Sequence, residues 1–318
     1  MEQVILLKVP PLEWEVIWGD GSLARKYNRE LAPGLDRNNN RTSGGGGFSG
    51  SDIIADGPFA GQTMDWLYKN HKEYFGTPDE LRWDDIIPVG GGILHAAEDL
   101  SVQVHPREDW AQEHLGIHGK SECWYIVDCP EGADIVMGHK AKTFAELDDY
   151  IAREAWEDLV ERHPIWPGCF YAIKAGTLHA IQKGTTFIEV CNPCPVTYRF
   201  YDYDRLDADG KPRYTDIPKT RENILVPNRI FTFPPIVSRY GGVKETWLAN
   251  NEDYSVWRYE VDGKGTVPRK KPFMGCFVIE GQGTIDGMPL EPGRNFFVSR
   301  DADEVTLEGK LDILCCHS

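Results

Sequence analysis

The feature that most constrains the fold is a series of short strand-like segments between residues 86 and 200. Runs rich in apolar, β-branched and aromatic residues alternate there with turns that contain Gly, Pro or acidic residues. The runs read LSVQVHP, CWYIVD, DIVMGH, FYAIKAG, TFIEVC and TYRFYDYD. Many short strands separated by turn residues are typical of an all-β sandwich or barrel. The sequence therefore predicts a mainly β fold.

Residues 143–163 interrupt this series with a different period. Thr143 followed by Glu146 has the form of a capping box, which marks the start of a helix. Apolar side chains then recur at helical spacing, at Phe144, Leu147, Ile151, Ala155, Leu159 and Val160. The pattern predicts a small helical insertion in the β domain.

Strand-like runs resume near residue 236, after a polar, proline-containing stretch at 203–235. The segment FVIEGQGTIDG reads as a strand, a glycine turn and a second strand. A chain of 318 residues is long for one core. We therefore expect two domains: residues 1–235, carrying the chemistry and the helical insertion, and a smaller β-barrel at 236–318, which has no His or carboxylate cluster at ligand spacing.

The one low-complexity stretch, NNNRTSGGGGFSGS at residues 38–51, has four consecutive glycines and no apolar periodicity. Such a composition is typical of flexible chain. We expect a mobile loop there.

Charge excludes two classes of partner. The formal net charge is −16, whereas nucleic acids and anionic membrane surfaces require a positive footprint. The longest apolar runs fall far short of the roughly 20 residues that span a bilayer. The N-terminal stretch has no basic region ahead of its apolar residues, so it does not resemble a signal peptide. We expect a cytoplasmic protein with a small-molecule partner.

The eight cysteines are scattered through apolar segments, which favours reduced, buried thiols. Cys191 and Cys194 have the spacing of a zinc or redox pair, but no second pair accompanies them. Cys315, Cys316 and His317 lie at the very end of the chain, where we expect a frayed tail that would hold a metal poorly. Neither group is predicted to be functional.

A candidate metal centre lies in the strand series. Gln103 and His105 are two residues apart in LSVQVHP, so they share one face of a strand. Glu122 lies in the next run and His179 in a later one. Imidazole nitrogens with carboxylate and amide oxygens suit Zn²⁺, with Mn²⁺, Co²⁺ or Fe²⁺ as alternatives. The competing interpretation is that the two histidines are separate hydrogen-bonded core residues.

These residues resemble the two motifs of the cupin superfamily. The first motif is His-x-His with a Glu further on, and the second is Gly, five residues, Pro-x-Gly, two residues and His. Lys174 stands where the second motif usually has proline. The matching residues are Gln103, His105 and Glu122 in the first motif, and Gly168, Gly176 and His179 in the second. The resemblance implies cupin-type double-stranded β-helix (jelly-roll) barrels.

A closer resemblance is to the short bacterial form of type I mannose-6-phosphate isomerase. It rests on LSVQVHP, GKSECWYIVD, AGTLHAI and VTYRFYDYDR in that order, on Trp18-Gly19, and on ADGPFAGQTMDWLY, and it covers nearly the whole chain. It implies a monomer that interconverts mannose 6-phosphate and fructose 6-phosphate through a cis-enediol. It also implies one Zn²⁺ per chain, held by Gln103, His105, Glu122 and His179.

The resemblance implies roles for five further residues. Lys120 matches a lysine at the reacting carbons, although it could be an exposed turn lysine. Arg199 and Arg205 match basic residues that face the sugar phosphate, unless they pair with nearby aspartates. Ser101 matches a phosphate-contacting serine, and Trp124 would flank the sugar ring or fill the core.

Two segments depart from the family pattern. The family has a lysine before the first motif, whereas this chain reads IPVGGGILHAA and has Gly92 at that position. The family also has a Gly-Glu-Ser-Trp-Glu-like strand where this chain has its glycine-rich stretch. Two alternatives therefore stay open: a related isomerase for another sugar phosphate or a free sugar, and a non-catalytic sugar-binding cupin.

Overall fold

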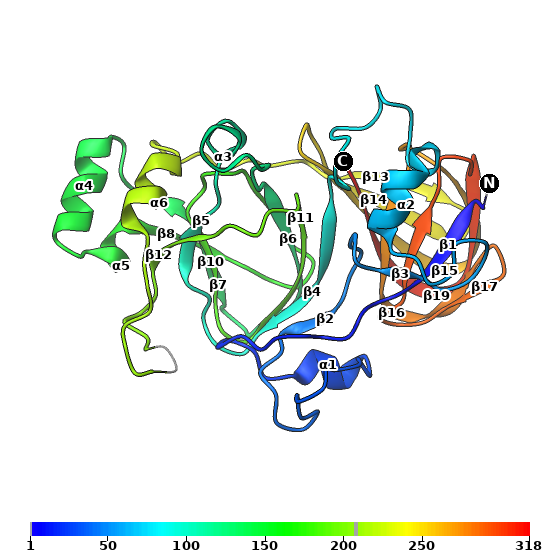
Figure 1. Cartoon of the computed structure of the whole chain (residues 1–318), viewed down its shortest axis with the longest axis horizontal. Coiled ribbons are helices and arrows are strands. Elements are labelled where there is room, and N and C mark those ends of the chain that lie inside the picture. Colours follow the sequence, from blue (N-terminus) through cyan, green and yellow to red (C-terminus); the bar gives the residue numbers. More distant parts are fainter. Residues whose placement is uncertain (1, 207–208) are drawn as a thin grey trace. The chain divides into compact units, whose positions relative to one another are not determined.

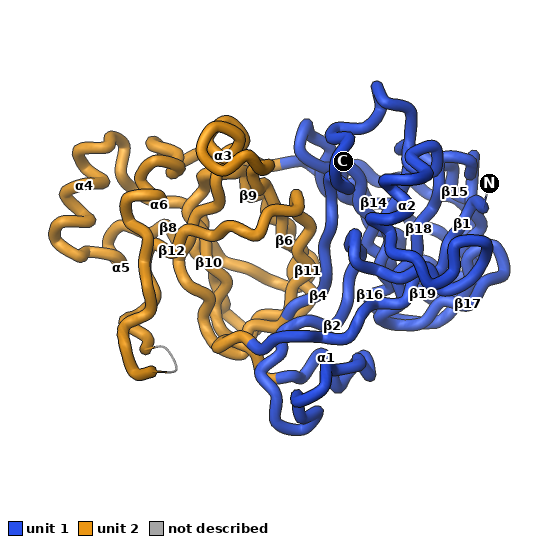
Figure 2. Tube along the Cα trace, in the orientation of Figure 1, with its two compact units in different colours: residues 1–15, 21–94, 233–318 blue, residues 16–20, 95–232 orange. Residues whose placement is uncertain are grey.

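The computed structural model describes residues 2–206 and 209–318, which form two compact units (Figure 2). Unit 1 contains the segment ending at Glu15 together with Gly21–Leu94 and Phe233–Ser318. Unit 2 contains Val16–Asp20 and His95–Thr232. Unit 2 is therefore almost one continuous stretch of chain, whereas unit 1 is assembled from separate segments.

This division differs from the predicted domains in its treatment of the N-terminal third. The last crossing between the units, at Thr232 and Phe233, lies close to the predicted boundary at 235. Residues before Leu94, however, lie mostly with the C-terminal strands. The reason is strand pairing, because β1 (Val4–Lys8) runs antiparallel to β18 (Asn295–Val298).

Unit 1 is built around one large sheet with the order β13-β14-β15-β19-β16-β18-β1-β3, with β17 added to β16 (Figure 1). Its core consists of apolar side chains from this sheet, among them Trp257, Tyr259 and Phe296. The remaining strands of the sheet are β3 (Ile53–Ile54), β13 (Ile236–Tyr240), β14 (Val243–Asn250), β15 (Ser255–Pro268), β16 (Met274–Ile285), β17 (Met288–Leu290) and β19 (Glu304–His317). Unit 1 also has α1 (Ser22–Lys26), β2 (Gly44–Gly46), α2 (Met64–Asn70) and the 3₁₀ helix η1 (Lys72–Tyr74), and β4 (Gly90–Ala96) leads into unit 2.

Unit 2 contains the strand series expected from the sequence. One sheet has the order β12-β5-β10-β7-β8, and β6 pairs with both β11 and β9 in another. The bounds are β5 (Val102–Val104), β6 (Glu122–Asp128), β7 (Asp134–His139), β8 (Val160–Pro164), β9 (Phe170–Ile173), β10 (His179–Ile181), β11 (Thr185–Cys191) and β12 (Tyr198–Tyr201). The helices are α3 (Glu108–Leu115), α4 (Phe144–Ala152), α5 (Trp156–Leu159) and α6 (Ile217–Asn223). The prediction of a mainly β fold is confirmed. Among residues 2–206 and 209–318, no helix is long and apolar enough to cross a membrane.

The helical insertion is shorter than predicted. Thr143 caps α4 as expected, because its Oγ1 accepts a hydrogen bond from the backbone N–H of Glu146 at 3.2 Å. The helix ends at Ala152, and Glu154 adopts a left-handed backbone with φ of 53°. A second helix, α5, then ends at Leu159, and the chain continues as β8. The predicted start of the helix is confirmed, but the prediction extended one helix across the break between α4 and α5.

Two predictions about the C-terminal strands are wrong. The segment FVIEGQGTIDG is not interrupted at its first glycine, because β16 continues through Gly281 to Ile285, and the turn falls at Asp286 and Gly287. The terminal residues Cys315, Cys316 and His317 are not frayed. They are buried in β19.

The glycine-rich stretch is also more ordered than predicted. Gly44–Gly46 form β2, which pairs with β4. A Cβ atom added to Gly47 would lie 1.9 Å from the carbonyl oxygen of Gly91 and 2.1 Å from Cα of Gly92. The two glycine tracts therefore pack backbone against backbone, a contact that only residues without side chains allow.

This packing predicts a large difference between two alanine substitutions in the same tract. Gly47→Ala should destabilise the protein by about 1–3 kcal/mol, because the new methyl group overlaps backbone atoms that cannot rotate away. Gly44→Ala should cost less than about 1 kcal/mol, because its Cβ would meet only Leu12 at 3.5 Å and Leu94 at 4.0 Å. Urea unfolding of both variants tests this. Equal costs would mean that the tracts do not pack as described.

Candidate metal centre

Three strands of one sheet in unit 2 bring site residues into a row. In the order β12-β5-β10, Arg199 lies opposite Gln103, and Gln103 lies opposite His179. Residues directly opposite on antiparallel strands project from the same face. His105 follows β5 by one residue, and Glu122 begins β6. The predicted ligands Gln103, Glu122 and His179 therefore lie in β5, β6 and β10, and His105 is the first residue after β5.

His105, Glu122 and His179 form a tight buried group. Nε2 of His105 lies 3.1 Å from Oε2 of Glu122, and Nε2 of His179 lies 3.4 Å from Oε1. All three side chains are at most 2% exposed, and one donor atom from each lies within 4.8 Å of the others. The two imidazole rings tilt towards each other with centroids 4.9 Å apart. This group can hold a metal ion.

The proton positions on the two histidines explain why a cation fits. Nδ1 of His105 donates to the carbonyl oxygen of Val196 at 3.0 Å, and Nδ1 of His179 donates to that of Thr177 at 2.8 Å. Because a carbonyl only accepts, each neutral ring carries its proton on Nδ1 and presents a lone pair at Nε2. Burial lowers the pKa of His179 to about 4, so its ring stays neutral.

The Glu122 carboxylate completes an acceptor-rich centre. Burial raises its pKa, but the Lys120 ammonium outweighs burial and holds the pKa well below its usual value. Nε2 of His105 has no hydrogen-bond partner among the described residues, although it is buried. Two imidazole lone pairs and a carboxylate that face one point suit a divalent cation.

Gln103 is placed beside this group but points its amide nitrogen at it. Nε2 of Gln103 lies 3.4 Å from Nε2 of His179, and Oε1 accepts a hydrogen bond from Ser101 at 3.3 Å. In this orientation Gln103 donates to the imidazole. It would bind a metal only with the amide turned over, so that Oε1 faces the centre.

Lys120 is buried against the carboxylates and is not an exposed turn lysine. Its Nζ lies 2.8 Å from Oε2 of Glu122 and 3.1 Å from Oε1 of Glu189, and the side chain is 12% exposed. Burial lowers the pKa of Lys120, but the two carboxylates outweigh burial and raise it well above its usual value. A metal cation beside Nζ would act in the opposite direction and lower the pKa of Lys120. In the protein alone the negative neighbours decide the direction.

The structure brings Arg199 to the site but engages Arg205 elsewhere. Nη1 of Arg199 donates to the carbonyl oxygen of Tyr214 at 2.8 Å, and its buried Nε has no hydrogen-bond partner among the described residues. The guanidinium of Arg205 is held by the Asp202 carboxylate, with a further bond from Nε to the Asp202 carbonyl oxygen at 3.2 Å. Arg199 is therefore the better placed of the two to meet an anion.

Trp124 and Ser101 lie beside the group in different roles. Trp124 is 1% exposed and packs its ring edge-on to His179, with centroids 5.4 Å apart. This position supports the core-filling interpretation of Trp124, because its ring is covered by protein. Ser101 is also buried, and its hydroxyl holds the Gln103 amide.

Comparison with known proteins identifies the family. The profile “Mannose-6-phosphate isomerase, cupin domain” matches residues 244–318. The chain is 36% identical over 273 residues to “Probable mannose-6-phosphate isomerase GmuF” of Bacillus subtilis, covering 84% of this chain and 85% of that protein. It is 35% identical over 274 residues to mannose-6-phosphate isomerase ManA of the same organism, covering 85% and 86%. The chain belongs to the mannose-6-phosphate isomerase family.

The crystal structure of the mannose 6-phosphate isomerase from Bacillus subtilis supports the same assignment. It superposes with a TM-score of 0.89 and 31% identity over the full length of both chains. The resemblance inferred from the sequence is thus confirmed. This chain is an enzyme of the mannose-6-phosphate isomerase type.

The place of the missing family lysine is closed by backbone. A Cβ atom at Gly92 would lie 2.6 Å from the carbonyl oxygen of Gly46. The backbone of residues 44–47 fills the space that a side chain at position 92 would need. The two departures from the family pattern are therefore coupled, since the glycines of one tract pack on those of the other.

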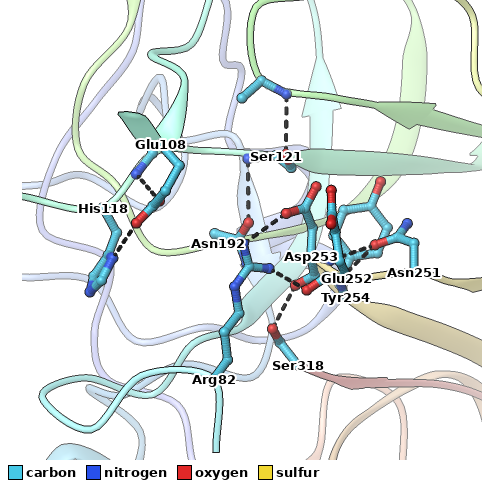
Figure 3. Close-up of polar contacts among 12 residues, drawn as sticks. Arg82, Glu108, His118, Ser121, Asn192, Asn251, Glu252, Asp253, Tyr254 and Ser318 are labelled. Carbon is cyan, nitrogen blue, oxygen red and sulfur yellow. Dashed lines mark hydrogen bonds and ion pairs between the residues drawn. The ribbon is translucent and has the colours of Figure 1, made fainter. Parts of the chain in front are cut away.

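Sequence reasoning missed Glu108, which holds the segment that carries Lys120 (Figure 3). Oε2 of Glu108 accepts from the backbone N–H of Gly119 at 2.7 Å, and Oε1 accepts from His118 Nδ1 at 2.8 Å. The backbone N–H of Lys120 donates to Pro106 at 3.1 Å. A Cβ at Gly119 would lie 2.6 Å from the backbone nitrogen of Glu108, so only glycine fits this approach.

The residue after Lys120 is pinned as well. Oγ of Ser121 accepts from the backbone N–H of Ala175 at 3.1 Å, and the Asn192 side chain accepts from the backbone N–H of Ser121 at 3.4 Å (Figure 3). Bonds on both sides of Lys120 thus fix its backbone. The sequence signal for these contacts is weak, because they join side chains to backbone groups and follow no period.

The thiols of Cys191 and Cys194, the cysteine pair near the site, are shifted by their surroundings towards the protonated form. Burial raises the pKa of the Cys191 thiol well above its usual value, and burial also raises that of Cys194. Metal binding uses thiolates, so thiols that stay protonated are poor ligands.

Proposed function

We propose that this enzyme interconverts mannose 6-phosphate and fructose 6-phosphate through a cis-enediol, with one divalent metal, Zn²⁺ by preference, as cofactor. The observation that carries the proposal is the buried convergence of His105, Glu122 and His179 on one point, with Lys120 within 2.8 Å of the same carboxylate. Gln103 completes the proposed ligand set. Family membership supports the choice of reaction.

The reaction needs two functions from this site. Converting the aldose to the ketose moves one proton from C2 to C1 and one from O2 to O1, with negative charge on the oxygens in between. A metal bound by this ligand set would supply a Lewis acid to those oxygens. We propose Lys120 Nζ as the proton-transfer atom, because it is buried and fixed by its backbone contacts, and its neutral amine form can take the C2 proton and return it to C1.

Arg199 is proposed to neutralise anionic charge on the substrate. Arg199 lies opposite Gln103, which in turn lies opposite His179; its side chain is half-buried and forms no ion pair among the described residues. Burial lowers the pKa of Arg199, and Arg213 adds to this effect. An anion bound to Arg199 would offset both the cost of burying its charge and the repulsion from Arg213. Arg205 and Ser101 are proposed as phosphate contacts of lesser weight, because both already have protein partners.

A second candidate is an isomerase of the same type with another sugar as substrate. The closed position at Gly92 favours it, because the family's lysine cannot be accommodated there without displacing Gly46. A coupled assay with mannose 6-phosphate and with free mannose, before and after chelation, separates the two. Turnover of mannose 6-phosphate that vanishes with chelator supports the first candidate, whereas turnover of the free sugar alone supports the second.

Arg199→Ala should distinguish phosphate binding from charge stabilisation in the reaction. If Arg199 binds phosphate, KM for mannose 6-phosphate should rise about 10- to 100-fold, because a charge-assisted hydrogen bond is lost. The matched control is Arg162→Ala in β8, whose guanidinium pairs with Asp134 and Glu157. A loss confined to kcat would show that Arg199 acts on the reacting atoms.

A further inference from the structure

Unit 1 contains a cavity of about 600 Å³ at the edge of its sheet, in a part of the chain with no assigned ligand. We call it the β13–β14 cavity. Figure 1 shows these two strands beside each other in the blue body of Figure 2. Six of its lining residues carry the argument: Ile236, Ser238, Glu245, Trp247, Lys270 and Lys271.

Strand register explains why polar and aromatic groups meet there. Ser238 pairs with Glu245 and Ile236 pairs with Trp247, so these four side chains share one face of the sheet. On the next strand, Glu245 lies opposite Tyr259. Tyr259 belongs to the apolar core of unit 1, which shows that the shared face is the inner one.

Glu245 is the feature that points to a ligand. Its side chain is 1% exposed, and Oε1 accepts a hydrogen bond from Trp247 Nε1 at 3.0 Å. Oε2 is buried and has no hydrogen-bond partner among the described residues. A carboxylate oxygen left in this state is costly unless a donor reaches it. A hydroxyl group from a molecule in the cavity would supply that donor.

Two lysines add positive charge to a chain whose net charge is −16. Nζ of Lys271 donates to the Asn250 side chain at 2.9 Å, and Nζ of Lys270 lies 5.5 Å from the ring centre of Tyr240. Neither lysine forms an ion pair with a carboxylate among the described residues. Both ammonium groups therefore keep the capacity to bind an anion.

Trp247 supplies the third element of recognition. Its ring is half-buried and stacks on Trp257 with centroids 4.9 Å apart and an angle of 21° between the planes. A ring held in this way offers a rigid apolar surface at low entropic cost. The aromatic ring suits the C–H face of a sugar, and the free carboxylate oxygen suits its hydroxyl groups. The two lysines suit a phosphate group on the same molecule.

We propose that the β13–β14 cavity binds a phosphorylated sugar at a site separate from the metal centre. Lys270 and Lys271 would hold the phosphate, Glu245 would accept from the sugar hydroxyls, and Trp247 would cover one face of the sugar. This second site goes beyond the isomerisation reaction, and it does not depend on which sugar the metal centre converts.

The test is a calorimetric titration of the metal-loaded full chain with sorbitol 6-phosphate, which lacks a carbonyl group and cannot be isomerised. Wild type should bind one more molecule of sorbitol 6-phosphate per chain than Lys270→Ala or Glu245→Gln. If the variants still bind at this site, their affinity there should be about tenfold lower than that of wild type. Inorganic phosphate and sorbitol, each alone, should bind at least about tenfold more weakly, because each uses only part of the cavity.

A matched control is Lys264→Ala, which removes an exposed lysine of β15 that pairs with Glu308. It should bind like wild type. Turnover of the two test variants at saturating substrate should also equal that of wild type, because neither residue belongs to the metal centre. Equal stoichiometry and affinity in wild type and both variants would overturn the proposal and show that water alone fills the cavity.

Discussion

Replacing His105 with alanine should remove the bound metal and the isomerase activity together. His105 supplies one of two imidazole lone pairs that face the Glu122 carboxylate, because the hydrogen bond from its Nδ1 to the carbonyl oxygen of Val196 leaves Nε2 facing Glu122. Without it the centre retains one imidazole and one carboxylate. A metal would stabilise the developing negative charge by several kcal/mol, and the variant loses this stabilisation. Turnover should therefore fall by at least about a thousandfold.

Metal content per chain, measured by mass spectrometry beside the turnover, checks this result. The matched control is His163→Ala, which removes a histidine of β8 in the same unit. The control should retain both metal and activity. If the His105 variant kept its activity, the catalytic centre would lie elsewhere in the molecule.

Lys120→Gln should separate proton transfer from metal binding. Glutamine can still donate a hydrogen bond to Glu122 but cannot move a proton, and it leaves both carboxylates with a polar neighbour. Turnover should fall about 100- to 10,000-fold, the usual contribution of a positioned acid or base. Metal content should stay at the wild-type value, because Lys120 is not a ligand.

The control for this substitution is Lys183→Gln, which changes an exposed lysine that pairs with Glu98. Its kcat should be unchanged. A Lys120 variant that lost its metal would assign the lysine to holding Glu122 in place, whereas unchanged turnover would exclude it from proton transfer.

The candidate ligands could be found from the sequence because their pattern follows backbone geometry. The two-residue spacing of Gln103 and His105 matches the period of a strand, and strand register then brings His179 opposite Gln103. Glu122 and Lys120 were recognisable from their motif. Each of these motifs spans only a few neighbouring residues, and the motifs follow one another in a fixed order. One sequence is therefore enough to predict them.

Other features depend on contacts that leave no periodic signal. The partner of β1 is β18, near the other end of the chain, and nothing in Val4–Lys8 specifies so distant a strand. The break after Ala152 depends on one left-handed residue, Glu154. Glu108 acts through the backbone of Gly119, and the glycine tracts exclude side chains from each other only once both are folded.

The pairing of β1 with β18 has a consequence for synthesis on the ribosome. Residues 95–232 emerge as one block and can complete their own strand pairs while later residues are still being made. Strand β1 can complete its pairing only when Val298 is available, because one of its two partners, β18, is the last strand but one. Most of unit 2 is thus inserted between two segments of unit 1, and residues Val4–Lys8, which are made before it, reach their partners in β18 only after it is complete.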